Sequence, residues 1–166
     1  MFYRRTLEDQ ADLIPFSREM EQTTRYFAFE VARFGEDRVC MNVEADYEVA
    51  DIMVPPFLIQ PLVENAVRHA MPSEGKLTIT ITAEVLEDEI VIAIADDGVG
   101  MTEEARQNIL HPESSTGLGI AVKNVHDRMV GYFGPGTHMD VESKLGKGTK
   151  ITLHLSREGL ESYMEE

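Results

Sequence analysis

The spacing of apolar residues predicts four helices. In three long segments, apolar side chains recur every three or four positions among charged ones, the pattern of an amphipathic helix. A short fourth helix is expected after Thr102, whose hydroxyl is a suitable N-cap, and it should end near His111. The long segments are residues 17–34, capped by Ser17 and ended by Gly35, residues 57–70, and residues 120–129.

Alternation of apolar and polar residues predicts β-strands. Leu77, Ile79 and Ile81 interleave with threonines, which is the period of a strand with one buried face. Residues 90–95 form a denser apolar run, typical of a strand covered on one or both faces, and residues 86–89 before it are a hairpin candidate. Strands in adjacent pairs, with helices that must cover one face, predict an α+β two-layer sandwich. Shorter strands are expected at residues 39–43, 140–143 and 149–155.

Length and charge limit the classes of function. The 166 residues, 43% of them hydrophobic, fit one globular domain. With 30 acidic and 15 basic side chains, the net charge of -15 would repel a phosphate backbone, which argues against nucleic acid as a partner. The apolar runs are shorter than a membrane span and the N-terminus lacks the core of a signal peptide. We therefore expect a cytoplasmic domain, and the lone Cys40 agrees with a reducing compartment.

Four short segments carry groups that suit a nucleotide, and the first lies on the helix predicted at residues 57–70. There Asn65, Arg68 and His69 follow at i, i+3 and i+4 and so share a face. An amide oxygen is a suitable ligand for Mg²⁺, and a neighbouring cation would meet a triphosphate. The same residues also fit a solvated polar face of an amphipathic helix.

The other three segments contain glycine. Asp96 directly follows an apolar strand and offers an acceptor for an exocyclic amine, while Gly98 and Gly100 let the backbone approach a ligand. Residues 117–119 read Gly-Leu-Gly and open a helix, whose free N–H groups favour phosphate. Residues 146–149, Gly-Lys-Gly-Thr, precede the last strand. Taken singly, the three also fit an Asp-Gly turn, a glycine loop and a hairpin turn.

The order and spacing of these segments resemble the GHKL ATP-binding domains, the group of gyrase, Hsp90-like chaperones, mismatch-repair ATPases and histidine kinases. The resemblance covers residues 54–155 and implies the Bergerat (GHKL) fold, a mixed sheet covered by helices on one face. Within the group, Pro-Pro-Phe-Leu-Ile-Gln-Pro-Leu-Val-Glu-Asn-Ala at residues 55–66 is similar to the asparagine box of LytS/YehU-type sensor histidine kinases. Residues 26–35, 123–129 and 132–134 are similar to that family too.

The resemblance implies roles for the motif residues. Asn65 would ligate Mg²⁺, Asp96 would bind the adenine amine of ATP, and Thr149 would lie near the base. Catalytic roles would fall to Glu64, Arg68 or His69, and the resemblance does not select among the three. The residues implied to bind the nucleotide are Asn65, Asp96, Gly98, Gly100, Gly117, Leu118, Gly119 and Thr149.

The family's phosphoacceptor histidine lies upstream on a dimerising helix, and none of the five histidines here has that context. His154, between two leucines of a predicted strand, is expected to be solvated on the opposite face. The resemblance therefore implies a catalytic domain that transfers the ATP γ-phosphate to a histidine on a separate upstream domain, and through it to a response regulator. The alternatives are a nucleotide-binding regulatory module and a serine kinase of the anti-sigma-factor type.

The domain boundaries follow from the same resemblance. Residues 1–35 would be an N-terminal helical segment leading from the dimerisation and phosphoacceptor region, residues 36–156 the catalytic domain, and residues 157–166 an acidic tail. The full-length protein is expected to be a homodimer anchored in the cell membrane. Residues 102–116 are expected to form an ATP lid. Pro61 stands where gyrase-like relatives carry a water-activating glutamate, which predicts slow ATP hydrolysis.

Overall fold

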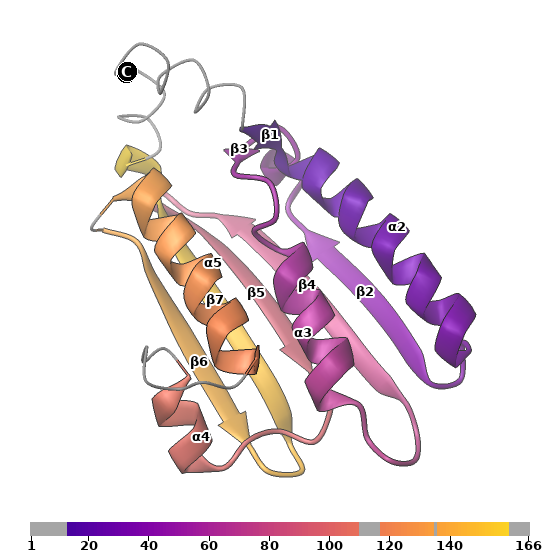
Figure 1. The fold of residues 1–166 in the computed structure, drawn as a ribbon. Coiled ribbons are helices and arrows are strands. Elements are labelled where there is room, and N and C mark those ends of the chain that lie inside the picture. Colours follow the sequence, from indigo (N-terminus) through magenta and orange to yellow (C-terminus); the bar gives the residue numbers. More distant parts are fainter. Residues whose placement is uncertain (1–12, 110–116, 135, 160–166) are drawn as a thin grey trace.

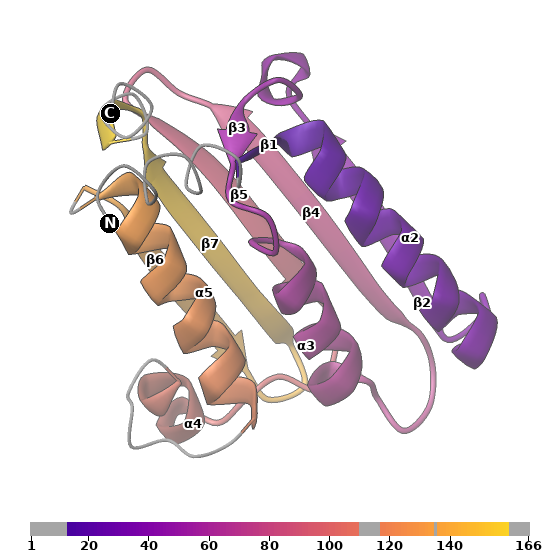
Figure 2. The same ribbon diagram turned by 45° about the horizontal axis from the view of Figure 1, so that its top comes forward.

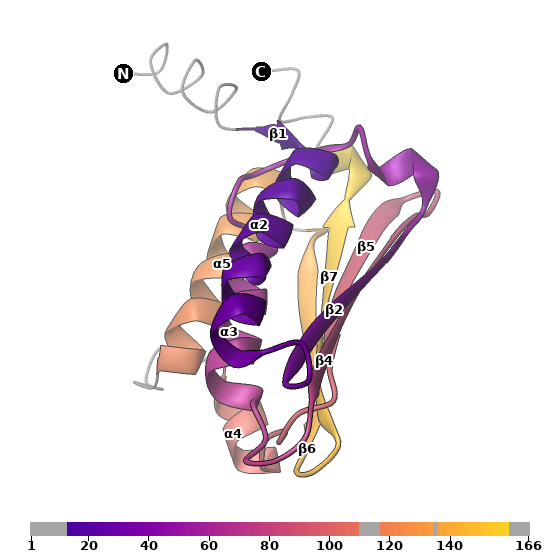
Figure 3. The same cartoon turned by 90° about the vertical axis from the view of Figure 1, so that its right-hand side faces the viewer.

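The structure is a computed structural model that describes residues 13–109, 117–134 and 136–159. Three long helices lie side by side on one face of a five-stranded sheet, and none of the described helices covers the other face (Figures 1 and 3). The α+β two-layer sandwich predicted from the sequence is confirmed. Within the described ranges, no helix combines the length and the apolar character that crossing a membrane requires.

The helices are interspersed with strands along the chain. The helices are α2 (Phe16–Phe34), α3 (Gln60–Ala70), α4 (Glu103–Asn108) and α5 (Gly117–Phe133), with a short 3₁₀ helix η1 (Tyr47–Val49). The strands are β1 (Ile14–Pro15), β2 (Val39–Ala45), β3 (Met53–Val54), β4 (Leu77–Val85), β5 (Glu89–Asp96), β6 (His138–Lys144) and β7 (Gly148–Ser156).

The main sheet has the order β2-β4-β5-β7-β6. Strands β2 and β4 run parallel and the other neighbours run antiparallel, so the sheet is mixed, as the resemblance implied. Ile81, Ile94 and Ile151 stand opposite one another in the three central strands and face the helices. The short strands β1 and β3 pair separately and bring the start of α2 to the segment before α3.

The hydrophobic core lies between the sheet and the helix layer. Helix α5 covers β6 and β7, α3 covers β4 and β5, and α2 lies along β2 (Figure 2). Full burial of a large apolar side chain contributes about 1.5–3 kcal/mol, so this layer supplies most of the driving force for folding. Helix α2 shares the same core through Phe16, Met20 and Phe27. The described part of the N-terminal segment therefore packs into the same core as the rest of the chain.

A buried carboxylate from α2 holds the N-terminus of α3. Glu19 is 1% exposed, and its Oε1 accepts the N–H of Phe57 at 3.0 Å. Its Oε2 accepts the next three N–H groups at 3.1, 2.9 and 3.2 Å, those of Leu58, Ile59 and Gln60. Ile59 is the N-cap of α3 and Gln60 its first residue, so the last two donors lie at the helix start, where the helix dipole favours a negative charge.

Helix α3 begins later than the sequence predicted. The sequence placed it near residue 57, but Phe57 has a φ of 61° and the helix begins at Gln60. The preceding residues wrap around Glu19 as a turn, so they are not helical. Pro61 lies in the first turn, where its missing N–H costs no hydrogen bond, as predicted.

The other predicted elements are present with shifted ends. Helix α2 begins at Phe16 with Pro15 as its N-cap, so the predicted cap at Ser17 is wrong. Helix α4 is capped by the Thr102 hydroxyl, which accepts the Ala105 N–H at 3.1 Å, as predicted. It ends at Asn108, and the predicted end near residue 111 lies outside the described residues. Helix α5 begins at Gly117, as the Gly-Leu-Gly motif predicted, and continues four residues past the predicted end.

Candidate nucleotide-binding site

A pocket lies between α3 and the ends of β5 and β7 that adjoin α4. It holds about 460 Å³ of space free of atoms, its open mouth included. Five site residues predicted from the sequence line it, namely Asn65, His69, Asp96, Gly100 and Thr149. The remaining lining residues are Leu62, Ala66, Ala70, Ile94, Met101, Ile109 and Ile151.

Asp96 is the last residue of β5 and points its carboxylate into the pocket. Its Oδ1 accepts the N–H of Gly98 at 2.9 Å, and the backbone of Thr149 on the neighbouring strand donates to it as well. Burial raises the pKa of Asp96 above its ordinary value, because it disfavours the charged form more than the two N–H groups stabilise it. The charge of Asp97 adds a smaller increase in the pKa. The site thus holds a desolvated acceptor whose protonation is sensitive to its surroundings.

Two glycines of the turn after β5 allow close backbone contact. A Cβ on Gly98 would lie 2.1 Å from the carbonyl oxygen of Ala70, and the Val99 N–H donates to that same oxygen at 3.0 Å. Gly100 has a φ of 70°, and a Cβ there would lie 2.0 Å from the carbonyl oxygen of Lys144. The turn therefore packs against the end of α3 and the β6–β7 hairpin with no room for side chains.

Ser143 belongs to the site, although the sequence reasoning missed it. Its Oγ accepts the Met101 N–H at 2.8 Å and donates to the Gly148 carbonyl oxygen at 3.0 Å. The Thr149 hydroxyl lies 2.8 Å away and donates to Ser143, whose single proton is already used. Ser143 thereby orients Thr149 and ties the turn after β5 to the hairpin. Its opposition to Thr149 across the hairpin could have signalled this role.

Helix α3 presents Asn65 and His69 to the pocket. Asn65 is 4% exposed and lines the pocket beside the apolar Leu62 and Ala66. His69 is more exposed, and burial of its ring lowers its pKa below 6.5, with Arg68 adding to the decrease. The imidazole of His69 is therefore neutral at pH 7, with one ring N–H to donate.

Glu64 and Arg68 do not line the pocket. Their charges instead act on Tyr26 of α2, whose pKa burial raises to about 12, with further increases from Glu30 and Glu64. The Gln60 amide donates to Glu64 Oε1 at 3.0 Å. Among the three residues predicted to share a face of α3, Arg68 is thus the one that the pocket does not include.

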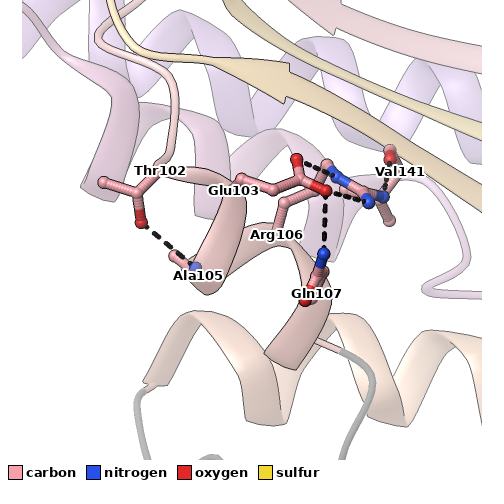
Figure 4. Close-up of polar contacts among 6 residues, drawn as sticks. All are labelled: Thr102, Glu103, Ala105, Arg106, Gln107 and Val141. Carbon is pink, nitrogen blue, oxygen red and sulfur yellow. Dashed lines mark hydrogen bonds and ion pairs between the residues drawn. The ribbon is translucent and has the colours of Figure 1, made fainter.

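Helix α4 borders the pocket and is tied to the sheet edge (Figure 4). Arg106 pairs with Glu103 through bonds of 2.6 and 2.9 Å, and its Nη1 donates to the carbonyl oxygen of Val141 on β6 at 3.1 Å. Gln107 also donates to Glu103, at 3.1 Å. The hydrogen bonds from Arg106 and Gln107 lower the pKa of Glu103 to about 2. The first part of the predicted lid is thus anchored, and residues 110–116 lie outside the described residues.

The predicted phosphate-binding motif forms the first turn of α5. Gly117, Leu118 and Gly119 open this helix, whose first N–H groups have no partner within the helix.

Comparison with known proteins identifies the family. Residues 56–159, well over half of the chain, match the sequence profile described as histidine kinase-, DNA gyrase B- and HSP90-like ATPase. The chain belongs to this family of ATPases. Sensor protein LytS of Bacillus cereus is 36% identical over 145 residues, which is 84% of this chain and 24% of LytS. Sensor histidine kinase YpdA of Escherichia coli K12 is 33% identical over 154 residues, which is 92% of this chain and 26% of YpdA.

Solved structures share the fold. The catalytic domain of histidine kinase ThkA has a TM-score of 0.66 at 17% identity, covering 88% of this chain and 96% of that domain. The histidine kinase domain of the blue-light-activated kinase of Erythrobacter litoralis has a TM-score of 0.65 at 17% identity, covering 93% of this chain and 67% of that one. At this identity the likeness shows that the chain shares the fold of histidine kinase catalytic domains. It spans about a quarter of the length of the curated relatives it matches.

Proposed function

We propose that the chain binds ATP with Mg²⁺ in the pocket and transfers the γ-phosphoryl group to a histidine on a separate upstream domain. The observation that carries this proposal is that Asp96, Asn65 and Thr149 line one pocket. An acceptor for a purine amine and an oxygen ligand for a cation therefore lie within reach of one nucleotide.

Adenine would lie on the apolar part of the pocket with its amine donating to Asp96. A carboxylate only accepts hydrogen bonds, so the carbonyl of guanine at that position would leave Asp96 unpaired and be rejected. Gly98 and Gly100 would hold the turn close to the base. The Thr149 hydroxyl, whose proton is directed to Ser143, would present a lone pair beside it.

Asn65 fits a role as a Mg²⁺ ligand. It supplies a hard amide oxygen at the pocket wall, and Mg²⁺ takes most of its remaining ligands from phosphates and water. The bound cation supplies charge neutralisation for the transferred group. The backbone N–H groups of residues 117–119 would hold the phosphates at the start of α5.

Glu64, Arg68 and His69 are the proposed residues of the transfer step. Neutral His69 lines the pocket and would donate its ring N–H to a phosphate oxygen. The charges of Glu64 and Arg68 influence Tyr26 of α2, so these two residues lie on the side of α3 that faces α2. There they would contact the incoming histidine domain. Pro61 provides no base for water, which favours transfer over hydrolysis.

The remaining partners are proposed from the likeness to LytS and YpdA. An upstream domain would supply the phosphoacceptor histidine and the dimer interface, and a response regulator would receive the phosphoryl group. The full-length protein would be a homodimer anchored in the membrane, with this domain in the cytoplasm.

Calorimetry with Mg-ATP and Mg-GTP tests base recognition. Asp96→Ala should lower ATP affinity about 10- to 100-fold, since a hydrogen bond to a charged group contributes about 1.5–3 kcal/mol. Asp97→Ala is the matched control. It removes the adjacent carboxylate, whose Oδ1 accepts the N–H of Thr78 and which does not line the pocket. Equal affinities of the wild type for ATP and GTP would refute the assignment of Asp96.

Radiolabel transfer tests the kinase reaction. The purified chain is incubated with γ-labelled Mg-ATP, alone and with a separately purified helical domain carrying the phosphoacceptor histidine of a LytS relative. We expect label on the supplied domain and none on the chain itself. Label on an added serine-containing substrate would support the serine kinase alternative, and nucleotide binding without transfer would support the regulatory module. Fast phosphate release that Glu64→Ala abolishes would indicate an ATPase.

A further inference from the structure

A cluster of two histidines and one aspartate lies on the face of the sheet opposite the helices, away from the nucleotide pocket. On β6, Met139 and Val141 are buried toward the helices, so His138 and Asp140 point to the opposite face. His154 on β7 is the direct cross-strand partner of His138. We infer that His138, Asp140 and His154 bind a transition-metal ion of the Zn²⁺ class.

The three side chains bring their ligand atoms to one point. Asp140 Oδ2 lies 3.1 Å from His154 Nε2 and 3.8 Å from His138 Nε2, and the ligand atoms of all three residues lie within 4.8 Å of one another. Tetrahedral Zn²⁺ with bonds of about 2.0–2.1 Å separates its ligands by about 3.3 Å. The Asp140 oxygen already lies close to this separation from both rings, and rotation of the exposed His138 ring would bring its nitrogen to the third position.

Glu89 completes the arrangement behind His154. Its Oε1 lies 3.1 Å from His154 Nδ1, on the far side of the ring from Asp140. A metal-binding histidine usually donates its second ring N–H to a carboxylate, which fixes the ring and leaves the other nitrogen for the metal. Glu89 thus directs Nε2 of His154 toward Asp140. His154 lies on the predicted face of its strand, where its side chain is half-buried, with 20% of it exposed.

The donor set selects the class of ion. Two imidazoles and one carboxylate suit Zn²⁺, Ni²⁺ or Cu²⁺, whereas Mg²⁺ prefers oxygen ligands alone. The site would therefore not compete for the Mg²⁺ of the nucleotide. Three protein ligands leave further coordination positions to water.

The two imidazole rings respond differently to binding. They are stacked with centroids 4.3 Å apart and an angle of 9° between their planes. Glu89 holds the ring of His154, while the side chain of His138 is 58% exposed and can turn its Nε2 toward the ion. Binding should therefore unstack the rings by rotating His138.

Calorimetric titration of the tag-free, EDTA-stripped chain with ZnCl₂ tests the site. The titration contains no nucleotide, so its outcome is independent of the proposed kinase activity. We expect one saturable site. His154→Gln and Asp140→Asn should each weaken Zn²⁺ binding at least 10-fold, and Glu89→Gln should weaken it about 10- to 100-fold through loss of the outer carboxylate. His126→Gln is the matched control, because it removes a histidine that also lies beside a carboxylate, Asp127, and should leave the affinity unchanged.

Two further measurements keep the result decisive. Circular dichroism of each variant checks folding, and His138→Gln provides a second ligand deletion on an exposed position. Nitrogen NMR of the imidazoles should show Nε2 of His154 metal-bound and Nδ1 protonated. Absence of saturable binding, or wild-type affinity in His154→Gln and Asp140→Asn, would overturn the inference.

Discussion

Glu19→Gln removes the carboxylate charge that accepts four backbone N–H groups at the start of α3. The carboxylate accepts these groups, from Phe57 to Gln60, at 2.9–3.2 Å, while only 1% exposed. Glutamine has nearly the same shape but only one acceptor oxygen, and its amide NH₂ would face the remaining donors. If the amide oxygen takes the place of Oε2, three N–H groups keep a weaker, uncharged acceptor and the Phe57 N–H loses its partner, in a site with little access to water.

The expected loss of stability is large. Hydrogen bonds to a charged group contribute about 1.5–3 kcal/mol each, and part of that loss is offset because a charge is no longer buried. We expect Glu19→Gln to lower the free energy of unfolding by about 3 kcal/mol, which is a large part of the ~5–15 kcal/mol typical of a domain. ATP affinity should fall as well, because α3 carries Asn65 and His69 into the pocket.

Urea unfolding at 25 °C, followed by circular dichroism, measures the change from the midpoint and slope. Glu21→Gln is the matched control on the same helix. Its carboxylate pairs with Arg25 at the surface, with 60% of the side chain exposed, and such pairs contribute about 0–1 kcal/mol. A Glu19→Gln variant as stable as Glu21→Gln would refute the role assigned to this buried carboxylate.

Three further predictions concern the pocket. Gly98→Ala should destabilise the fold by about 1–3 kcal/mol in thermal unfolding, because its Cβ would lie 2.1 Å from the Ala70 oxygen. Gly131→Ala, which meets no atom within 4 Å on α5, should stabilise it by about 0.5–1 kcal/mol. Because burial raises the pKa of Asp96, the carboxylate should begin to take up a proton above pH 3.8, and ATP affinity measured from pH 8 downward should begin to fall there. Over the same pH range the stability of the fold should rise, because protonation removes a buried charge. Hydrogen exchange at residues 102–109 should slow on adding Mg-ATP if they form a lid, and unchanged exchange would argue against one.

The sequence predicted the sheet well because alternation reports which face of a strand is buried. Leu77, Ile79 and Ile81 are all fully buried, and the threonines between them face the other side. Each strand end moved by only a few residues, since the apolar pattern weakens where a strand leaves the core. Glu19 could not be predicted in the same way, because its partners are 38 or more positions away along the chain.

The face that α3 turns to the pocket was only partly predictable. At about 100° per residue, Arg68 lies about 60° to one side of Asn65 and His69 about 40° to the other. Spacing alone therefore allows both to join Asn65. Helix α2 decides between them, because Tyr26 lies on the side of Arg68 and Glu64, leaving His69 at the pocket.

Strand β7 connects the two sites, and its register explains why only one was visible in the sequence. Thr149 lies near the start of β7 and pairs with Asp96 on β5, whereas His154 lies near its end and pairs with His138 on β6. The first pairing brings together residues of recognisable motifs, but the second depends on the length of the β6–β7 hairpin, which places 138 opposite 154. A one-residue change in that hairpin would turn His138 or His154 toward the helices and separate the ligands. The metal site is therefore a property of the register, and no local pattern of residues could have indicated it.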